Sequence, residues 1–200
     1  DRKPKGGESF LQRALPVEKQ TLIAAHNAKV VMDYGFTSAY SAGGSTYSLE
    51  ANLRDEINEG WIPGPRLLAA GTESVNDAND LGVHQSDNIG AVRAYIEKTA
   101  QVGADSVKFI LSGPGFQVSE DVMPMYSDAQ LEVAEKVAAE KDVWLTGHAR
   151  PNAAIRQALK FGFRVIYHCD EIDEEALDMM EARKHNLFIG PTPAFSGRSR

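Results

Sequence analysis

Short apolar segments alternate with longer amphipathic segments along most of this chain, and this alternation constrains the fold more than any other feature. The apolar segments are expected to be strands at residues 37–40, 66–70, 105–111, 143–147, 163–167 and 186–190. They are short and mostly apolar, as are parallel strands that are covered on both faces. The intervening segments are predicted helices at residues 17–34, 49–59, 88–102, from 127 onward, 152–160 and 173–185. The sequence therefore predicts an α/β fold whose parallel sheet is built from βα units.

Such a sheet can close in two ways, as a (β/α)8 barrel or as an open doubly wound sheet. No G-x-G-x-x-G motif follows the first predicted strand, which disfavours a dinucleotide-binding fold. The segment SGPG at residues 112–115 also lacks the lysine and hydroxyl pattern of a phosphate-binding loop. The length of 200 residues favours one domain over residues 1–200. Polar loops follow the C-terminal ends of the strands, where both folds place their sites.

The charge of the chain narrows the range of partners. Its 21 lysines and arginines against 28 aspartates and glutamates give a formal net charge of −7. Nucleic acids and anionic membranes favour a basic surface, so we expect neither as a partner and expect a small-molecule substrate instead. No apolar run approaches the roughly 20 residues of a membrane span. The single cysteine, Cys169, allows no internal disulfide, and a cytoplasmic location is expected.

A lysine stands inside the apolar segment GADSVKFILSG at residues 103–113. Burying an unpaired ammonium is costly, so Lys108 must either reach water or take part in chemistry. The next two predicted strands end in histidines, His148 and His168. In a barrel all three residues would point toward the same mouth, and strand alternation places Lys108 on the face toward the barrel axis.

Two neutral imidazoles and one anionic ligand suit zinc or a similar divalent metal. A neutral lysine amine can supply the anion if it adds carbon dioxide to become a carbamate, which could bridge two metals about 3.5–4 Å apart. Three alternatives stay open: Lys108 could extend to solvent, it could form a Schiff base as in an aldolase, and the histidines could be ordinary core residues. If His168 points toward the axis, alternation predicts that Tyr167 points away from it and serves only for packing.

The ordered segments GADSVKFILSG, YSDAQLEVAEKVAAEKDVWLTGHA, NAAIRQALKFGFRVIYHCDEIDEEALDMM and NLFIGPTPA resemble the amidohydrolase superfamily. More narrowly, they are similar to its imidazolonepropionase-like and prolidase-like metal-dependent hydrolases. The upstream segments NAKVVMDYGFTSAYSAGG and LRDEINEGWIPGPRLLAAG resemble the second and third barrel strands of the same family. The resemblance extends from about Val17 onward. It implies a (β/α)8 TIM-type barrel of which this chain holds strands 2 to 7.

The resemblance also implies roles for individual residues. Lys108 would be the carboxylated bridging ligand, and His148 and His168 would bind one of two metals, zinc being the expected ion. Water held by the metals would attack a C–N bond in an amide, a cyclic amide or a peptide-like substrate. His84 lies in a loop where the family often has a histidine, and Tyr40 stands where it usually has an Arg-Asp pair. Both are candidate substrate-binding residues.

Two departures from the family pattern qualify the expected activity. No His-x-His pair occurs at the start of the chain, and the family's catalytic aspartate would lie beyond Arg200. We therefore expect no catalytic acid–base residue within these 200 residues and no hydrolysis by them alone. The alternative is a non-catalytic fragment or degenerate relative that binds a metal or small ligand without turnover. A partial barrel would expose two sheet edges, which favours a homo-oligomer.

Overall fold

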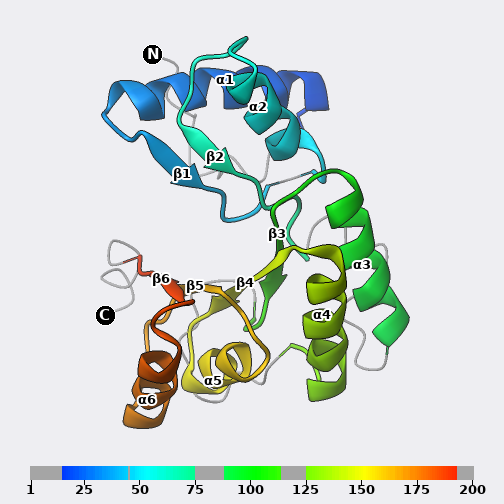
Figure 1. The fold of residues 1–200 in the computed structure, drawn as a ribbon, viewed down its shortest axis with the longest axis vertical. Helices are drawn as coiled ribbons and strands as arrows, with labels where there is room; N and C mark the ends of the chain where they lie inside the picture. The colour runs from blue at the N-terminus through cyan, green and yellow to red at the C-terminus, as the bar shows by residue number, and fades with distance from the viewer. Residues whose placement is uncertain (1–14, 45, 75–87, 114–124, 193–200) are drawn as a thin grey trace. The chain divides into compact units, whose positions relative to one another are not determined.

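The computed structural model describes residues 15–44, 46–74, 88–113 and 125–192, and these form alternating strands and helices (Figure 1). The helices are α1 (Val17–Asp33), α2 (Leu49–Asn58), α3 (Ile89–Gln101), α4 (Asp128–Lys141), α5 (Asn152–Lys160) and α6 (Glu174–Arg183). The strands are β1 (Ser38–Tyr40), β2 (Arg66–Leu68), β3 (Ser106–Ile110), β4 (Trp144–Ala149), β5 (Val165–His168) and β6 (Phe188–Gly190). The α/β prediction is confirmed. Within the described ranges, no helix has both the length and the apolar character needed to cross a membrane.

The chain divides into two compact units. The first comprises Asp1–Ala39 and Asn52–Leu67, and the second comprises Tyr40–Ala51 and Leu68–Arg200. Helix α1 and most of α2 belong to the first unit, while α3 to α6 and β3 to β6 belong to the second. The predicted ligand residues Lys108, His148 and His168 all lie in the second unit.

The second unit is organised around a parallel sheet of four strands in the order β3-β4-β5-β6. Its register aligns Lys108 with Thr146, Thr146 with Val165, and Val165 with Phe188. The segment after β2 continues this arrangement, because Glu73 forms a parallel bridge with Lys108 and Gly44 forms one with Thr72. Strands β1 and β2 make a separate two-stranded sheet. The sequential parallel order is the one that consecutive βα units produce.

One face of β3 is packed against the helices. Val107, Phe109 and Leu111 belong to the buried apolar core, together with apolar side chains of α3, α4 and α5. The Phe109 ring makes edge-to-face contacts with Tyr95, Tyr126 and Phe163, with ring centroids 5.2–5.8 Å apart. This arrangement confirms the predicted alternation, and it leaves Lys108 on the opposite face of the sheet.

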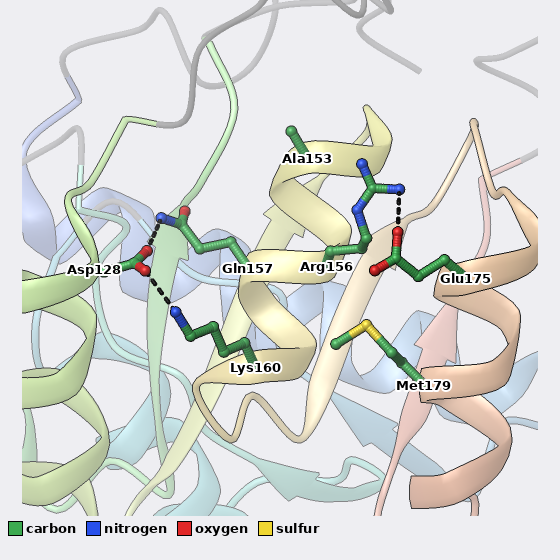
Figure 2. Close-up of a pocket in the computed structure, with 7 residues that line it drawn as sticks. All are labelled: Asp128, Ala153, Arg156, Gln157, Lys160, Glu175 and Met179. Carbon is green, nitrogen blue, oxygen red and sulfur yellow. Dashed lines mark hydrogen bonds and ion pairs between the residues drawn. The ribbon is translucent and has the colours of Figure 1, made fainter.

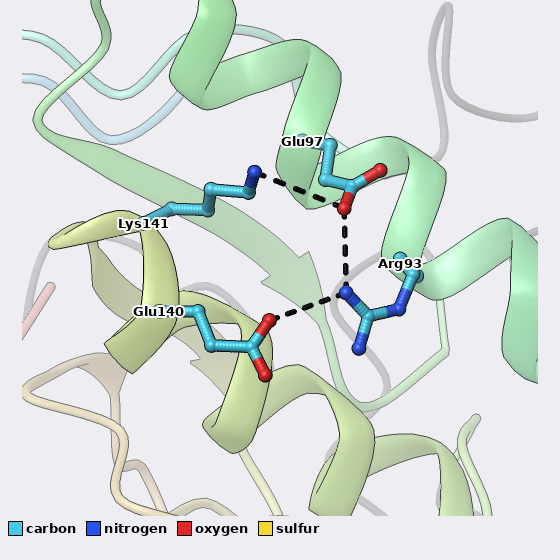
Figure 3. A network of polar contacts seen from close by, with 4 residues as sticks. All are labelled: Arg93, Glu97, Glu140 and Lys141. Atoms are coloured by element: carbon cyan, nitrogen blue, oxygen red, sulfur yellow. Dashed lines mark hydrogen bonds and ion pairs between the residues drawn. The ribbon is translucent and has the colours of Figure 1, made fainter.

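Helices α3 and α4 lie side by side, and ion pairs connect their exposed surfaces (Figure 3). Arg93 contacts Glu97 on its own helix at 3.3 Å and Glu140 on α4 at 3.2 Å, while Lys141 approaches Glu97 at 3.9 Å. Exposed pairs of this kind are screened by water and salt and add little to stability. The buried side chains between the helices therefore account for most of their association.

A capping box begins α4, as its sequence predicts. The Ser127 hydroxyl accepts a hydrogen bond from the Gln130 backbone N–H, and the Gln130 side chain accepts one from the Ser127 N–H at 3.0 Å. We expect Ser127→Ala to lower the free energy of unfolding by about 1 kcal/mol, because one helix donor loses its partner. Urea denaturation measures this, with Ser127→Asp as the control that retains a cap. Equal stability of the alanine and aspartate variants would contradict the prediction.

Candidate metal centre

Lys108 lies at the centre of β3 and is only 2% exposed, so it does not extend to solvent. Its Nζ lies 4.2 Å from the centroid of the Tyr167 ring, a cation–π contact. Burial lowers the pKa of the Lys108 amine from 10.5 to about 8, and the nearby Glu73 carboxylate acts more weakly in the opposite direction. The neutral amine, which is the form that can add carbon dioxide, is thus far more accessible than in an exposed lysine.

Glu73 and Gly43 are close neighbours of this lysine. Gly43 has φ +105°, and a Cβ placed there would lie 2.7 Å from the Glu73 Cγ and 3.0 Å from the Lys108 Cγ. The close approach therefore requires glycine at this position. Burial raises the pKa of the Glu73 carboxyl, and Lys108 partly offsets that rise. The sequence pattern singled out neither residue.

A second half-buried carboxylate lies near the start of α2. The Ser41 hydroxyl donates to the Glu50 Oε2 at 2.5 Å, and the Ala70 N–H donates to the same oxygen at 3.2 Å. Burial nevertheless raises the pKa of Glu50. The Ser41 hydroxyl is therefore engaged by Glu50. The sequence pattern did not identify Glu50.

His148 and His168 come together at the ends of β4 and β5. Their ring centroids are 4.4 Å apart, with the ring planes at 69°. The His148 Nε2 is buried and has no hydrogen-bond partner among the residues that the structure describes. The His168 Nδ1 lies 2.7 Å from the Thr192 Oγ1, a contact that orients the ring and leaves its Nε2 for another partner.

Both imidazoles are held in the neutral form. Burial lowers the pKa of His148 to about 3, and it lowers the pKa of His168 to about 4. The charges of Lys108 and Arg150 contribute to both shifts, which places all four groups in one electrostatic neighbourhood. Neutral imidazoles with available nitrogen lone pairs are the form in which histidine binds metals.

The backbone at the end of β5 is unusual, and it corrects the prediction for Tyr167. His168 has φ +81° and Cys169 has φ +52°, left-handed values that are uncommon for residues other than glycine. The regular alternation of the strand therefore stops at His168. The Tyr167 ring lies over the Lys108 amine and 6.5 Å from the Tyr40 ring, so the prediction that it points away from the lysine is wrong.

Tyr40, in β1, contacts the face of the four-stranded sheet that carries Lys108, and its hydroxyl is already engaged. The Tyr40 Oη is 2.5 Å from the Thr146 Oγ1, and its ring stacks on Trp144 at 6.2 Å. A cavity of about 320 Å³ adjoins it and is largely apolar; its lining comprises Tyr40, Leu68, Trp144, Val165, Tyr167, Phe188, Ile189 and Gly190. The lining of the cavity includes the first residues of β4, β5 and β6. Parallel α/β folds place their sites at the opposite, C-terminal ends of the strands. His84, the other candidate substrate-binding residue, lies outside the described residues.

The donor set needs a third ligand. Among the described residues, no three histidine, cysteine, aspartate or glutamate side chains come together in a group that could hold a metal. Two imidazoles alone do not complete a zinc site, which takes at least three protein ligands. A carbamate on Lys108 would add the missing anionic oxygen, and the unpaired His148 Nε2 is suited to a metal. The residues present therefore fit a metal if the lysine is carboxylated.

A second hollow lies on the surface between α4, α5 and α6 (Figure 2). Its volume is about 410 Å³, and its charged side chains already contact one another. Lys160 pairs with Asp128 at 2.6 Å, and Arg156 pairs with Glu175 at 3.4 Å. Because these charges neutralise each other and face water, the buried lysine and histidines are the stronger candidate site.

The sequence matches no protein-family model and no curated protein sequence. Solved structures do resemble it. A Xaa-Pro dipeptidase with methionine bound in its active site matches 94% of this chain at 25% identity, with a TM-score of 0.77. An amidohydrolase matches 89% at 24% identity and a TM-score of 0.71, and the A. niger ochratoxinase matches 91% at 19% identity and a TM-score of 0.73.

These structural neighbours belong to the amidohydrolase superfamily, and the chain shares their fold. The family resemblance found in the sequence is thereby confirmed for the fold. The chain spans about half the length of each neighbour, between 48% and 50%.

Proposed function

We propose that this chain is part of a metal-dependent hydrolase that cleaves a C–N bond in an amide, a cyclic amide or a peptide-like substrate. The observation that carries the proposal is the buried Lys108 beside two neutral histidines on consecutive parallel strands. The shared fold with a dipeptidase and an amidohydrolase supports it. The substrate would be a small molecule, with dipeptides, N-acyl amino acids and ureas as the classes to try first.

The proposed architecture is a (β/α)8 barrel in which β1 to β6 are the second to seventh strands. The sequential parallel order of β3 to β6 supports this closure, as does the coverage of about half of each neighbour. Further metal ligands and the acid–base group would then come from residues outside this chain. Strand β6 is the edge of the described sheet and exposes Phe188 at 54%, which fits our proposal that the chain forms a homo-oligomer.

The residues of this chain would prepare the site in three ways. The neutral Lys108 amine adds carbon dioxide, forming an N–C bond and releasing one proton to water, and so becomes an anionic carbamate. His148 and His168 present neutral nitrogen donors beside it. The Tyr167 ring covers the lysine and limits the access of water. A bound divalent metal, zinc in this proposal, supplies activated water and polarises the substrate carbonyl.

Metal content tests the proposal. We expect the purified wild-type chain, treated with zinc and bicarbonate, to retain stoichiometric metal after gel filtration, and Lys108→Ala to retain only background amounts. Inductively coupled plasma mass spectrometry gives the metal-to-protein ratio. The control is Lys160→Ala, which removes an exposed lysine that pairs with Asp128. Equal metal content in wild type and Lys108→Ala would show that the lysine is not a ligand.

A non-catalytic role is the second candidate function. It is favoured by the lack of a His-x-His pair in these 200 residues. No hydrolysis is expected of these 200 residues alone, so the two functions are separated by assaying the metal-loaded longer protein of this proposal against dipeptides, N-acyl amino acids and ureas. Release of an amine supports the hydrolase. Stoichiometric metal without any release supports the binding role.

A further inference from the structure

We propose that the buried ion pair between Arg150 and Asp170 is a positioning pair that holds the His168 ring against the His148 ring. Arg150 lies two residues after His148, and Asp170 lies two residues after His168. The Arg150 Nη1 is 2.5 Å from the Asp170 Oδ2, and the two side chains are 2% and 7% exposed. This inference rests on the proposed function, since it assigns a task to residues around the candidate metal ligands.

The pair links the ends of three strands. The Arg150 N–H donates to the Ser112 Oγ at 3.4 Å, just beyond β3. The Cys169 N–H donates to the Ala149 carbonyl at 3.0 Å, and the Glu171 N–H donates to the Arg150 carbonyl at 3.2 Å. The ion pair between the Arg150 and Asp170 side chains also joins the segments that follow β4 and β5. Together these contacts fix where the chain turns after each histidine.

The turn that they enclose is strained. Left-handed φ angles at His168 and Cys169 cost on the order of 1 kcal/mol or more each, and such conformations persist only where their surroundings determine them. If the backbone at His168 relaxed to an extended conformation, the two-residue period of the strand would direct its ring to the opposite face. The distance of 4.4 Å between the two ring centroids therefore depends on the turn.

Asp170 also balances the charge of Arg150. A buried arginine without a partner would leave an uncompensated positive charge beside a site meant for a cation. Asp170 cancels that charge. Burying an ion pair is seldom the most stable choice, because desolvation offsets much of the attraction, so a role in fixing geometry explains it better than stability alone.

Cobalt binding to the full chain tests the inference. Co²⁺ is titrated in bicarbonate buffer into wild type, Asp170→Asn and Asp170→Glu, with affinity measured by calorimetry and ligand geometry by visible absorption. Asp170→Glu keeps the charge but lengthens the side chain by one methylene, so it tests geometry separately from charge. We expect both variants to bind roughly tenfold to a hundredfold more weakly with an altered spectrum.

The matched control is Arg183→Met. Arg183 donates to the Leu159 and Phe163 carbonyls at 2.7 and 2.9 Å, before β5 begins, so its loss should lower thermal stability without changing Co²⁺ affinity. Wild-type affinity and spectrum in a folded Asp170 variant would overturn the inference, as would an equal loss of affinity in Arg183→Met. If Asp170→Asn does not fold, Asp170→Glu decides alone.

A metal-free measurement separates the two proposals. If wild type binds no Co²⁺, the proposed function fails, and the NMR resonances of the two imidazole rings in the metal-free chain then decide this inference. Rings in contact shift each other's resonances, so Asp170→Glu should move the His148 and His168 ring signals while Arg183→Met leaves them in place. Unmoved signals in Asp170→Glu would contradict the positioning role.

Discussion

Lys108→Met is expected to raise the free energy of unfolding of the metal-free chain by about 2 kcal/mol at pH 7, while it removes metal binding. A drop of the lysine pKa from 10.5 to about 8 corresponds to roughly 3 kcal/mol of unfavourable burial of the ammonium. Loss of the cation–π contact with Tyr167 destabilises the variant by about 1 kcal/mol, which offsets part of this gain. Methionine is apolar and unbranched, so it can occupy the same space without a charge.

The gain in the free energy of unfolding of Lys108→Met over wild type should depend on pH. The pKa of Lys108 is lower in the folded state than in the unfolded state, so the penalty is fully present below about pH 8. Between about pH 8 and 10.5 the unfolded state holds more protons, and the wild type gains stability as the pH rises. The advantage of Lys108→Met should therefore shrink between pH 7 and pH 9.5.

Urea denaturation in the presence of a chelator at these two pH values measures the effect. Lys160→Met is the control, because its side chain is 57% exposed and its stability should change little at either pH. If Lys108→Met is less stable than wild type at pH 7, the buried amine is making favourable contacts that outweigh its desolvation. The account of a lysine retained for function at a cost in stability would then fail.

The metal-free chain is expected to lose stability steeply as the pH falls below about 6.5. Burial holds the pKa of His148 at about 3 and the pKa of His168 at about 4, against 6.5 for an ordinary histidine. Between these values the unfolded state binds protons that the folded state does not, so stability rises with pH across that window and falls toward acid. With two such groups, the unfolded state binds up to nearly two more protons than the folded state, and this difference sets how steeply the free energy of unfolding changes with pH. The partial exposure of His168 makes the change less steep.

His148→Gln isolates this contribution, because glutamine does not titrate. Between pH 6.5 and pH 4, we expect its free energy of unfolding to fall less steeply than that of wild type, because unfolding of the variant takes up about one proton fewer. His185→Gln is the matched control, since it removes an exposed histidine of the same unit. Identical slopes for His148→Gln and wild type would show that His148 is not held neutral by burial.

The sequence was sufficient to predict the elements and the alternation of β3. Strands covered on both faces have a strong apolar signal, and a period of two residues assigns Lys108 and Phe109 to opposite faces whatever the rest of the chain does. The positions of His148 and His168 at strand ends followed from the same pattern. That neighbouring parallel strands end at the same edge placed the two backbone positions near each other, whereas the contact between the rings also needs the left-handed turn at His168.

The remaining site residues depended on features that have no local signal. Tyr167 was misplaced because the left-handed backbone at His168 breaks alternation, and no glycine marks the position. Glu73 reaches Lys108 through a bridge between segments far apart in the chain. Arg150 and Asp170 look like ordinary loop residues until the strand register brings the positions two residues after each histidine together.

¹³C NMR of the zinc-loaded chain in ¹³C-labelled bicarbonate shows whether Lys108 carries the carbamate on which the proposed site depends. We expect a slowly exchanging carbamate resonance in wild type and in Lys160→Met, and its loss in Lys108→Met. A zinc-loaded wild type without this resonance, or a Lys108→Met variant that keeps it, would contradict the account.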